Sequence, residues 1–505
     1  MKLFGSAYLL LLAGLPLAAD PISFVLISSS STGALVRASA DFRSVTTIAR
    51  ISNGTSVGKD LNGNYLVTTS TSLLRVTPTG VVTSIADAPT IPPTGWIGVV
   101  TDSQGNYVIV DNVQHAVWRI SPSGGSVLKV ANYTVTNPGE QEDANILIDP
   151  NGNYLVLEDN NSVAQMFSIT PAGGVTPITM SGAAATATDG FVPDGAGNYL
   201  FASYRDDSVF GVTPGGVVSV FSHVGSEICC NLVGMARNPN TGELVVPTFG
   251  GSVLHVNSNG NFVTTVAPSG SLLNHLQSIL AETYGALPHL TVGNVWTTGF
   301  FIVNSGNQPA QFSISFFDDS GNPVAIPFGA PIGTVNAYQG TVPAGGMIYV
   351  EASNPSAPEP VAVWGLISSD PTVTVQALFR RQVGAVYYEA AVGATPGSFG
   401  FALPFDATTF APTGDALYTG FAIVNLDTVN SAAVSCSAAD QNGVTIPNGV
   451  PLPNLSPLGH YANYLFSALT GLRGTLTCSS STKVAALALR AIGTNAISTL
   501  PVIIQ

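Results

Sequence analysis

A short turn motif recurs through the first half of the chain and limits the possible folds more than any other feature. Asp60-Leu-Asn-Gly-Asn-Tyr-Leu-Val is followed by related segments that start at Asp102, Asp149, Asp194 and Asn238. The turn glycines of these five segments are separated by 42, 47, 45 and 45 residues. A second turn, of the form Ser/Thr-Pro-x-Gly, follows each of the first four motifs. A period of this length is typical of repeat architectures, in which each unit packs on its neighbours.

Each repeat contains four short β-strand patterns separated by hairpin signals. In one unit they are Ile97–Thr101, Asn106–Val110, Ala116–Ile120 and Val127–Ala131. In the turns, the Asp carboxylate accepts hydrogen bonds from nearby backbone N–H groups and the Gly adopts a positive φ. Four-stranded units of about 40–50 residues are typical of β-propeller blades, which stack around an axis and so bury their sheet faces.

The ends of the repeat region predict how the ring closes. Ser23–Ser28, Ala34–Ala38 and Val45–Arg50 match the second, third and fourth strands of a blade that lacks its first strand. Leu276–Ala281, after the fifth complete repeat, has the pattern of a first strand. Joining the two ends makes a sixth blade and removes exposed sheet edges. We therefore predict six blades, with seven as the alternative.

After residue 284 the period stops and a different duplication begins. Trp296-Thr-Thr-Gly-Phe-Phe-Ile-Val-Asn matches Tyr418-Thr-Gly-Phe-Ala-Ile-Val-Asn when one Thr is omitted, which places Asn304 and Asn425 121 residues apart. Two units of about 110 residues with about seven short strands each indicate immunoglobulin-like β-sandwiches. The expected organisation is a signal peptide at 1–19, a propeller at 20–284 and β-sandwiches at 285–395 and 396–505.

The charge content argues against one class of protein, those that bind nucleic acids. Only 9% of the residues are charged, compared with about 25% in ordinary soluble domains. The formal net charge is −14, with only 15 Lys and Arg, which argues against nucleic-acid binding.

The only short helix candidates are Leu272–Thr283 and His460–Leu469. The predicted fold class is all-β: a six-bladed β-propeller followed by two immunoglobulin-like β-sandwich domains.

The first residues have the pattern of a secretory signal. Lys2 precedes an apolar run at Tyr8–Ala19, and small residues precede Asp20. This run is shorter than the about 20 apolar residues that span a bilayer, and no later stretch is long enough. We therefore expect a secreted, extracellular or periplasmic protein without a membrane span, cleaved near Ala19.

The four cysteines fit an oxidising compartment. Cys436 and Cys478 lie in two strand-like runs, where either a disulfide bond between neighbouring strands or a buried reduced pair would fit. Cys229 and Cys230 are adjacent, and either a vicinal disulfide or two free thiols would fit there.

Asp102–Ile120, with the sequence DSQGNYVIVDNVQHAVWRI, resembles the NHL repeat in its Asp/Gly/Asn hairpin, its aromatic residue and a basic residue before the last apolar one. Arg37, Arg75 and Arg119 share this basic position in the first three blades. The resemblance covers about residues 22–285. It implies an exported bacterial propeller of the NHL, gluconolactonase-like or streptogramin lyase-like kind, with C-terminal immunoglobulin-like modules. Such propellers include binding modules, lyases and lactonases.

Several of the few carboxylates follow second strands, in loops that meet on one face of a propeller. We expect this face to bind the ligand, through the acidic residues of three successive blades: Asp111, Glu158, Asp159, Asp206 and Asp207. Clustered carboxylates also bind hard cations such as Ca²⁺, and a solvated acidic rim is the alternative.

A metal site is a second expectation, at the entries of the innermost strands. Asn145 takes the place that Gly98 occupies in another blade; Asp143 precedes it, and Asp189 lies at the entry of the next blade. Asn145 and Asp189 resemble the metal-binding arrangement of gluconolactonase-like propellers, which implies Ca²⁺ or another divalent cation. This sequence departs from that pattern because residues 20–59 contain no Glu. Polar capping of the strands is the alternative.

These features favour a non-enzymatic, exported binding or scaffold protein whose sandwiches act as spacer or attachment modules. The expected partner is an extracellular protein or a small-molecule or carbohydrate ligand. One alternative is a metal-dependent lactonase or lyase; the loop histidines His115 and His223 are its candidate bases. Another is a structural subunit of an extracellular assembly, because the low-charge sandwich faces would suit self-association.

Overall fold

The computed structural model describes residues 22–30, 32–42, 45–87, 95–136, 144–160, 163–185, 188–203, 205–224, 232–238, 241–266, 275–409, 414–428, 430–450, 452–464, 469–493 and 496–504. All named elements in these ranges are β-strands, so the all-β prediction is confirmed. The two helix candidates were wrong where they are described, since Leu276–Val292 and His460–Tyr464 are strands. The expected signal peptide and the Cys229–Cys230 pair lie outside the described residues. No helix in the described ranges is long and apolar enough to cross a membrane.

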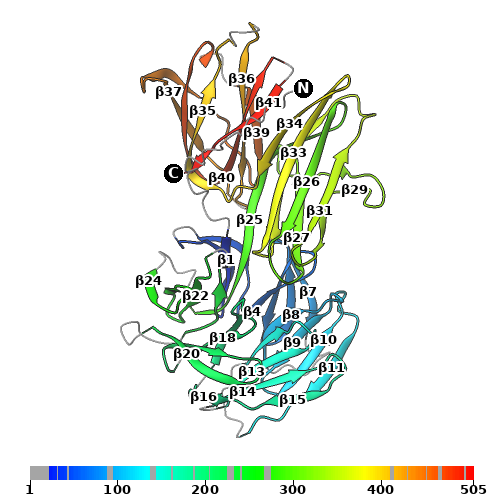
Figure 1. The fold of residues 1–505 in the computed structure, drawn as a ribbon, viewed down its shortest axis with the longest axis vertical. Coiled ribbons are helices and arrows are strands. Elements are labelled where there is room, and N and C mark those ends of the chain that lie inside the picture. Colours follow the sequence, from blue (N-terminus) through cyan, green and yellow to red (C-terminus); the bar gives the residue numbers. More distant parts are fainter. Residues whose placement is uncertain are drawn as a thin grey trace, which may run out of the picture.

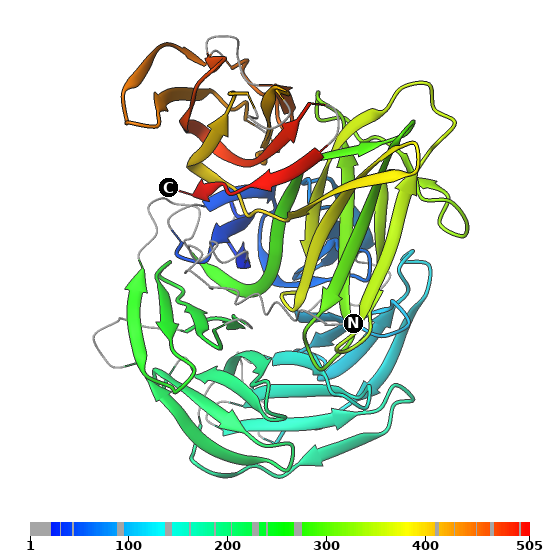
Figure 2. The same ribbon diagram turned by 45° about the horizontal axis from the view of Figure 1, so that its top comes forward.

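Within the described residues, six antiparallel units of four strands form a ring of blades (Figure 2). Blade 1 consists, from the axis outwards, of β25 (Leu276–Val292), β1 (Ile22–Ser28), β2 (Ala34–Ser39) and β3 (Val45–Arg50). Blade 2 consists of β4 (Gly54–Lys59), β5 (Tyr65–Thr69), β6 (Ser72–Val76) and β7 (Val82–Asp87), and blade 3 of β8 (Trp96–Thr101), β9 (Tyr107–Asp111), β10 (Ala116–Ile120) and β11 (Val127–Asn132). Blade 4 consists of β12 (Ala144–Ile148), β13 (Tyr154–Asn160), β14 (Val163–Ile169) and β15 (Val175–Ile178), and blade 5 of β17 (Thr188–Pro193), β18 (Tyr199–Ser203), β19 (Ser208–Val212) and β20 (Val217–His223). Blade 6 consists of β21 (Ala236–Arg237), β22 (Leu244–Pro247), β23 (Val253–Val256) and β24 (Phe262–Val266). A two-residue strand, β16 (Ser181–Gly182), pairs with β20 in parallel.

The predicted closure of the ring is confirmed. β25 pairs with β1 in antiparallel register, with Phe24 opposite Ala281, so the two ends of the repeat region complete one blade. All seven residues of β1 are buried. Phe24 packs in a cluster with Val245 of blade 6, whereas its neighbour Val25 packs in a cluster with Val57 of blade 2. Successive side chains of a strand point to opposite sheet faces, so a strand between two blades is buried at every position.

The recurring Asp motif forms a hairpin and a contact between blades. Asp60 Oδ1 accepts hydrogen bonds from the N–H groups of Asn62 and Asn64, both at 2.8 Å. The Tyr of the second and of the third motif extends to the Asp of the preceding blade. Tyr107 hydrogen-bonds Asp60, and Tyr154 Oη lies 3.5 Å from Asp102 Oδ2. The motif therefore recurs because it shapes each blade and ties it to its neighbour, which hairpin chemistry explains without a calcium ion.

The first β-sandwich grows directly out of the propeller. β25 continues past residue 284 and pairs with a strand of the sandwich, so one strand belongs to both sheets (Figure 1). One sandwich layer has the order β25-β32-β27-β30 and the other β31-β26-β33-β34. The new strands are β26 (Trp296–Asn304), β27 (Ala310–Phe317), β30 (Ala337–Val342), β31 (Met347–Ser353), β32 (Val361–Ser369), β33 (Val373–Val383) and β34 (Val386–Gly393), and the pair β28 (Ile326–Pro327) and β29 (Thr334–Val335) lies outside the two layers. Fully buried side chains such as Phe300 and Phe312 fill the space between the layers.

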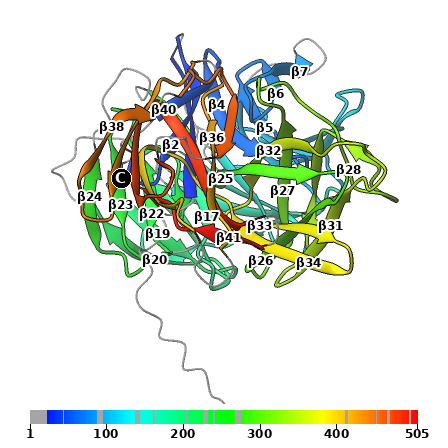
Figure 3. The same ribbon diagram turned by 90° about the horizontal axis from the view of Figure 1, so that it is seen from above.

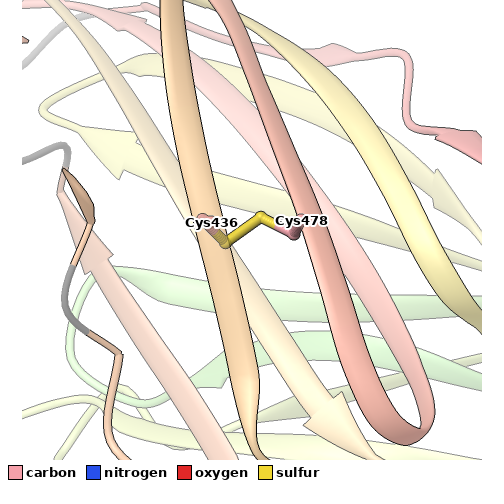
Figure 4. The surroundings of a disulfide bond; sticks show 2 residues. All are labelled: Cys436 and Cys478. Atoms are coloured by element: carbon pink, nitrogen blue, oxygen red, sulfur yellow. A yellow bond between two sulfur atoms is a disulfide. The ribbon is translucent and has the colours of Figure 1, made fainter.

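The second β-sandwich is held together by one long strand, β40 (Arg473–Ile492). The first half of β40 pairs with β35 and β37, and its second half pairs with β36 and β41. The remaining bounds are β35 (Ser398–Asp406), β36 (Leu417–Asn425), β37 (Val434–Asp440), β38 (Thr445–Val450), β39 (His460–Tyr464), β41 (Ala496–Leu500) and β42 (Ile503–Ile504). Cys436 and Cys478 lie directly opposite each other and form a disulfide bond, so the first alternative for this pair is confirmed (Figure 4).

The duplication predicted between the two sandwiches is visible in a pair of buried asparagines. Asn304 Nδ2 donates to the carbonyl of Gln308 at 2.7 Å, and its Oδ1 accepts from Thr372 Oγ1 at 2.8 Å. Asn425 makes the same kinds of bond, to Asn430 O and from Thr482 Oγ1, both at 2.8 Å. A buried amide that satisfies loop carbonyls explains why this residue recurs in both copies.

Candidate binding face of the propeller

The two faces of the propeller differ in what covers them. We call the side with the loops between second and third strands, and with the connections into first strands, the loop face; the opposite side is the hairpin face. β25 starts opposite Ser28 at the loop face and leaves the propeller at the hairpin face, where Thr283 lies opposite Ile22. The first sandwich therefore stands on the hairpin face, as Figure 1 shows. Two polar contacts fix it to the turn of blade 2: Lys59 Nζ donates to Ser369 O at 3.2 Å, and Gln339 Nε2 donates to Asn62 Oδ1 at 2.8 Å.

Three of the predicted ligand-binding carboxylates lie at the loop-face ends of second strands, but they are buried. Asp111, Glu158 and Asp159 have exposed fractions of 0%, 0% and 1%. Asp111 Oδ1 accepts hydrogen bonds from the N–H groups of Val113 and Gln114 at 3.1 and 2.9 Å. Burial raises the pKa of Asp111, and these N–H groups oppose that rise. Asp111 thus shapes its loop, and direct contact of these three carboxylates with a ligand would require the loops to move.

Glu158 forms a pair with a histidine from the neighbouring blade. Glu158 Oε1 lies 2.7 Å from His115 Nδ1. The His115 side chain is 22% exposed and adopts a positive φ of 45° in the loop between β9 and β10. A carboxylate that binds one ring nitrogen orients the imidazole, as in general-base sites. His223, the other candidate base, instead shares a 2.8 Å hydrogen bond with Ser208, which is itself buried.

Asp206 and Asp207 are the predicted acidic residues that lie nearer the surface. Asp206 is exposed and Asp207 is half-buried, in the loop between β18 and β19. Ser203 Oγ donates to Asp206 Oδ2 at 2.7 Å, and Arg205 precedes the two acids in the same loop. This bond holds the Asp206 carboxylate at the loop face.

The residues predicted for a metal site lie on adjacent inner strands. Asn145 is in β12, and Asp189 in β17 accepts the N–H of Gly234 at Oδ1 over 3.2 Å. Asp143 lies outside the described residues. Asn145 and Asp189 alone supply fewer oxygen donors than the six to eight that Ca²⁺ takes. In the part of the chain that the structure describes, no three His, Cys, Asp or Glu side chains gather closely enough to hold a metal ion.

The glycines at the equivalent inner-strand position have a packing role. A Cβ built on Gly98 would lie 3.1 Å from Ile146 Cγ2 of the next blade, and one on Gly190 would lie 2.4 Å from the carbonyl carbon of Gly234. First strands of neighbouring blades therefore approach too closely at these glycines for a side chain.

A buried polar cluster that the sequence did not reveal lies at the hairpin face, between the propeller and the first sandwich, centred on Glu282 of β25. The Glu282 side chain is fully buried and binds Arg37 Nε at 2.8 Å and Lys59 Nζ at 3.0 Å. Tyr65 Oη at 2.9 Å and Ser368 Oγ at 3.1 Å complete its hydrogen bonds. Burial alone would raise the pKa of Glu282, but the charges of Lys59 and Arg37 lower it to about 2. We call these five residues the Glu282 cluster.

The Glu282 cluster explains one recurring residue. Arg37 occupies the basic position of the NHL-like motif, and in blade 1 the first strand has no hairpin turn that could supply an Asp. In blade 1, Glu282 therefore takes the place of the hairpin Asp as the acid that binds Arg37. The only sequence signal was a lone Glu within a strand-like run, which is not distinctive.

Comparisons with known proteins find only distant structural similarity. No family model and no curated sequence matches the chain. Similar solved structures include a nidogen/laminin complex, with a TM-score of 0.42 and 12% identity, covering 52% of this chain and 98% of that one. Virginiamycin B lyase from Staphylococcus aureus has a TM-score of 0.36 and 14% identity, covering 51% of this chain and 77% of that one. A gluconolactonase from Xanthomonas campestris has a TM-score of 0.36 and 11% identity, covering 50% and 86%. Each of these similarities is at low identity and spans about half of this chain.

Proposed function

We propose that this chain is an exported, non-enzymatic binding protein of the NHL-repeat type, which recognises a cationic group of an extracellular protein with its loop face. The observation that carries the proposal is the position of the first sandwich on the hairpin face, which leaves the described residues of the loop face uncovered by either sandwich (Figure 1). The shared strand β25 and the buried Glu282 cluster make the immunoglobulin-like sandwiches a stiff support. The loops that would bind the ligand are thereby held at a fixed orientation, which lowers the entropy cost of binding.

The charge of the chain suggests the class of partner. The formal net charge is −14, and Asp206 and Asp207 present carboxylates at the loop face. Complementary charge increases both the rate and the specificity of association. A lysine-rich segment fits this surface better than an acidic or a purely apolar ligand.

A hexalysine peptide, titrated calorimetrically at low ionic strength, tests the proposal. We expect Asp206→Asn with Asp207→Asn to weaken binding about tenfold, because each exposed charge contributes up to roughly 1 kcal/mol. The matched control is Asp318→Asn with Asp440→Asn, which removes the same charge from two sandwich turns. Asn keeps the oxygen that accepts the backbone N–H bonds of these turns. Equal weakening in both variants, or no binding by the wild-type chain, would contradict the proposal.

The His115–Glu158 pair favours a second candidate, a lactonase or lyase acting on a small extracellular substrate. Glu158 holds His115 Nδ1 and thereby directs the other ring nitrogen, Nε2, as the proton acceptor. Asp143, Asn145 and Asp189 would hold a divalent cation in this alternative, but the described donors do not suffice for one. Turnover of a lactone by the wild-type chain that disappears in His115→Ala would replace the binding proposal by this one.

A further inference from the structure

The two sandwiches use equivalent sheet faces in different ways. In the first sandwich, Val303 of β26 lies between Met347 of β31 and Thr374 of β33. In the second, Val424 of β36 lies between His460 of β39 and Ala485 of β40. The duplicated sequences align Val303 with Val424, so the outer face of β31-β26-β33-β34 corresponds to the outer face of β39-β36-β40-β41. We call the first the open face and the second the docked face.

The docked face is an interface within the chain. Ala422 and Val424 are 3% and 0% exposed. Val424 packs in one cluster with Trp364 and Leu366, which project from the other sheet of the first sandwich. Trp364 Nε1 also donates to Leu458 O across this contact, at 3.0 Å. This strand face, in one copy of the sandwich, is therefore built to bind a neighbouring sheet.

The open face is exposed among the described residues, although it carries side chains typical of interfaces. Val303, Met347 and Tyr349 are 41%, 54% and 39% exposed. The rings of Phe301 and Tyr349 pack 4.6 Å apart. Aromatic residues, Met and Arg are enriched in protein interfaces, and contiguous exposed apolar residues mark interaction sites. Figure 3 shows β26, β31, β33 and β34 at the periphery of the molecule.

Charged side chains border the open face in a pattern that suits a second copy of itself. Arg380 lies between two acids, with Nη1 2.6 Å from Glu351 Oε1 and Nε 2.7 Å from Glu389 Oε1. In a two-fold arrangement, Arg380 of one copy would meet the acids of the other. Most homo-oligomers use such two-fold contacts, in which the same patch serves both subunits.

In a head-to-tail contact, the open face of one copy would pack on a different sheet of another copy. The exposed sheet of the second sandwich that contains β37, β40 and β35 does not suit such a contact. Phe317 pairs with Trp364 in the first sandwich, and Ala439 pairs with Thr475 at the matching position of the second. By the same register, Leu366 corresponds to Thr477. Thr475 and Thr477 are exposed, so the sheet that is apolar in the first copy is polar in the second. A polar outer face is what a terminal repeat presents to water.

We propose that the open face is a homodimer interface, in which two copies of the chain pack open face against open face about a two-fold axis. Four strands about 4.8 Å apart and about seven residues long make a patch of roughly 20 Å by 20 Å. A patch of this size lies below the standard interface of about 800 Å² per partner, so we expect a weak dimer.

Because the dimer is expected to be weak, sedimentation velocity over about 1 to 100 µM tests the proposal. The wild-type chain is expected to shift from monomer to dimer, and Val303→Asp with Met347→Asp is expected to raise the dissociation constant at least tenfold. Both replaced side chains are exposed, and the denaturant midpoint of each variant checks that it is folded. The control, Thr475→Asp with Thr477→Asp, adds the same charge to the polar sheet and is expected to leave the dimer unchanged.

The following results would overturn the proposal. One is a wild-type chain that stays monomeric at the highest concentration. Another is a dimer that persists when the open-face substitutions are made, and a third is a dimer that dissociates when the control substitutions are made. Open-ended assembly would also overturn it, because a two-fold contact closes after two copies. None of these results bears on peptide binding at the loop face.

Discussion

Replacing Glu282 with alanine is expected to lower the free energy of unfolding by about 3–5 kcal/mol, because it leaves two buried cations without their counter-charge. Arg37 and Lys59 are 8% and 7% exposed at their side chains, and both bind the Glu282 carboxylate. Arg37 also stacks on the ring of Tyr284, with its guanidinium carbon 3.3 Å from the ring centre. This contact persists in the variant, but it does not neutralise the charge.

Denaturant unfolding of wild type and Glu282→Ala measures the effect. Glu359→Ala is the matched control, since Glu359 is exposed in a sandwich loop and its loss is expected to change stability by no more than about 0.5 kcal/mol. Glu282→Gln keeps the shape of the side chain and removes the charge. If Glu282→Ala and Glu359→Ala unfold at the same denaturant concentration, the Glu282 cluster does not stabilise the junction.

The second large effect is expected from acid, at the contact between the two sandwiches. His289 of β25 stacks on His460 of β39, with ring centres 5.4 Å apart. His460 Nδ1 lies 2.7 Å from Asp319 Oδ1. Burial, together with the neighbouring His460, lowers the pKa of His289 from 6.5 to about 4.

The direction of the pH dependence follows from that shift. Between pH 6.5 and about 4 the unfolded chain binds a proton at His289 that the folded chain does not. The stability linked to His289 is therefore complete above pH 6.5 and decreases as the pH falls towards 4. A shift of this size corresponds to roughly 3 kcal/mol at the acid end of the window.

Unfolding curves recorded at several pH values across this window, for wild type and His289→Gln, test the prediction. The slope of stability against pH is expected to be smaller in His289→Gln. His275→Gln, which replaces an exposed histidine of the propeller, is the matched control. An unchanged slope in His289→Gln would show that the proton is taken up elsewhere.

Much of the fold could be predicted from the sequence because its signals are local. The hairpins at Asp60 and Asp102 depend on hydrogen bonds that span four residues, so a short motif suffices to recognise them. The closure of blade 1 was also predictable. Ser23–Arg50 contains the second, third and fourth strand patterns of a blade without its first, and Leu276–Ala281 contains a first-strand pattern without the other three. The Cys436–Cys478 pairing followed from two strand patterns, although its oxidation state did not.

The candidate site was less predictable, because burial depends on neighbouring blades. Asp111 and Asp206 both follow second strands, but Asp111 is fully buried and Asp206 is exposed. The pairing of His115 with Glu158 joins two blades across 43 positions of sequence, so no local pattern reveals it.

The sequence by itself determined the repeating units: the hairpins, the buried strands between blades and the duplicated sandwich pattern. Each of these follows from hydrogen bonds and alternation within a few residues of the chain. Only the tertiary structure decided which propeller face is covered, because that depends on β25 continuing unbroken from blade 1 into the sandwich. It also decided that Glu282 is ionised in the interior, since the charges of Arg37 and Lys59 reach it from two different blades.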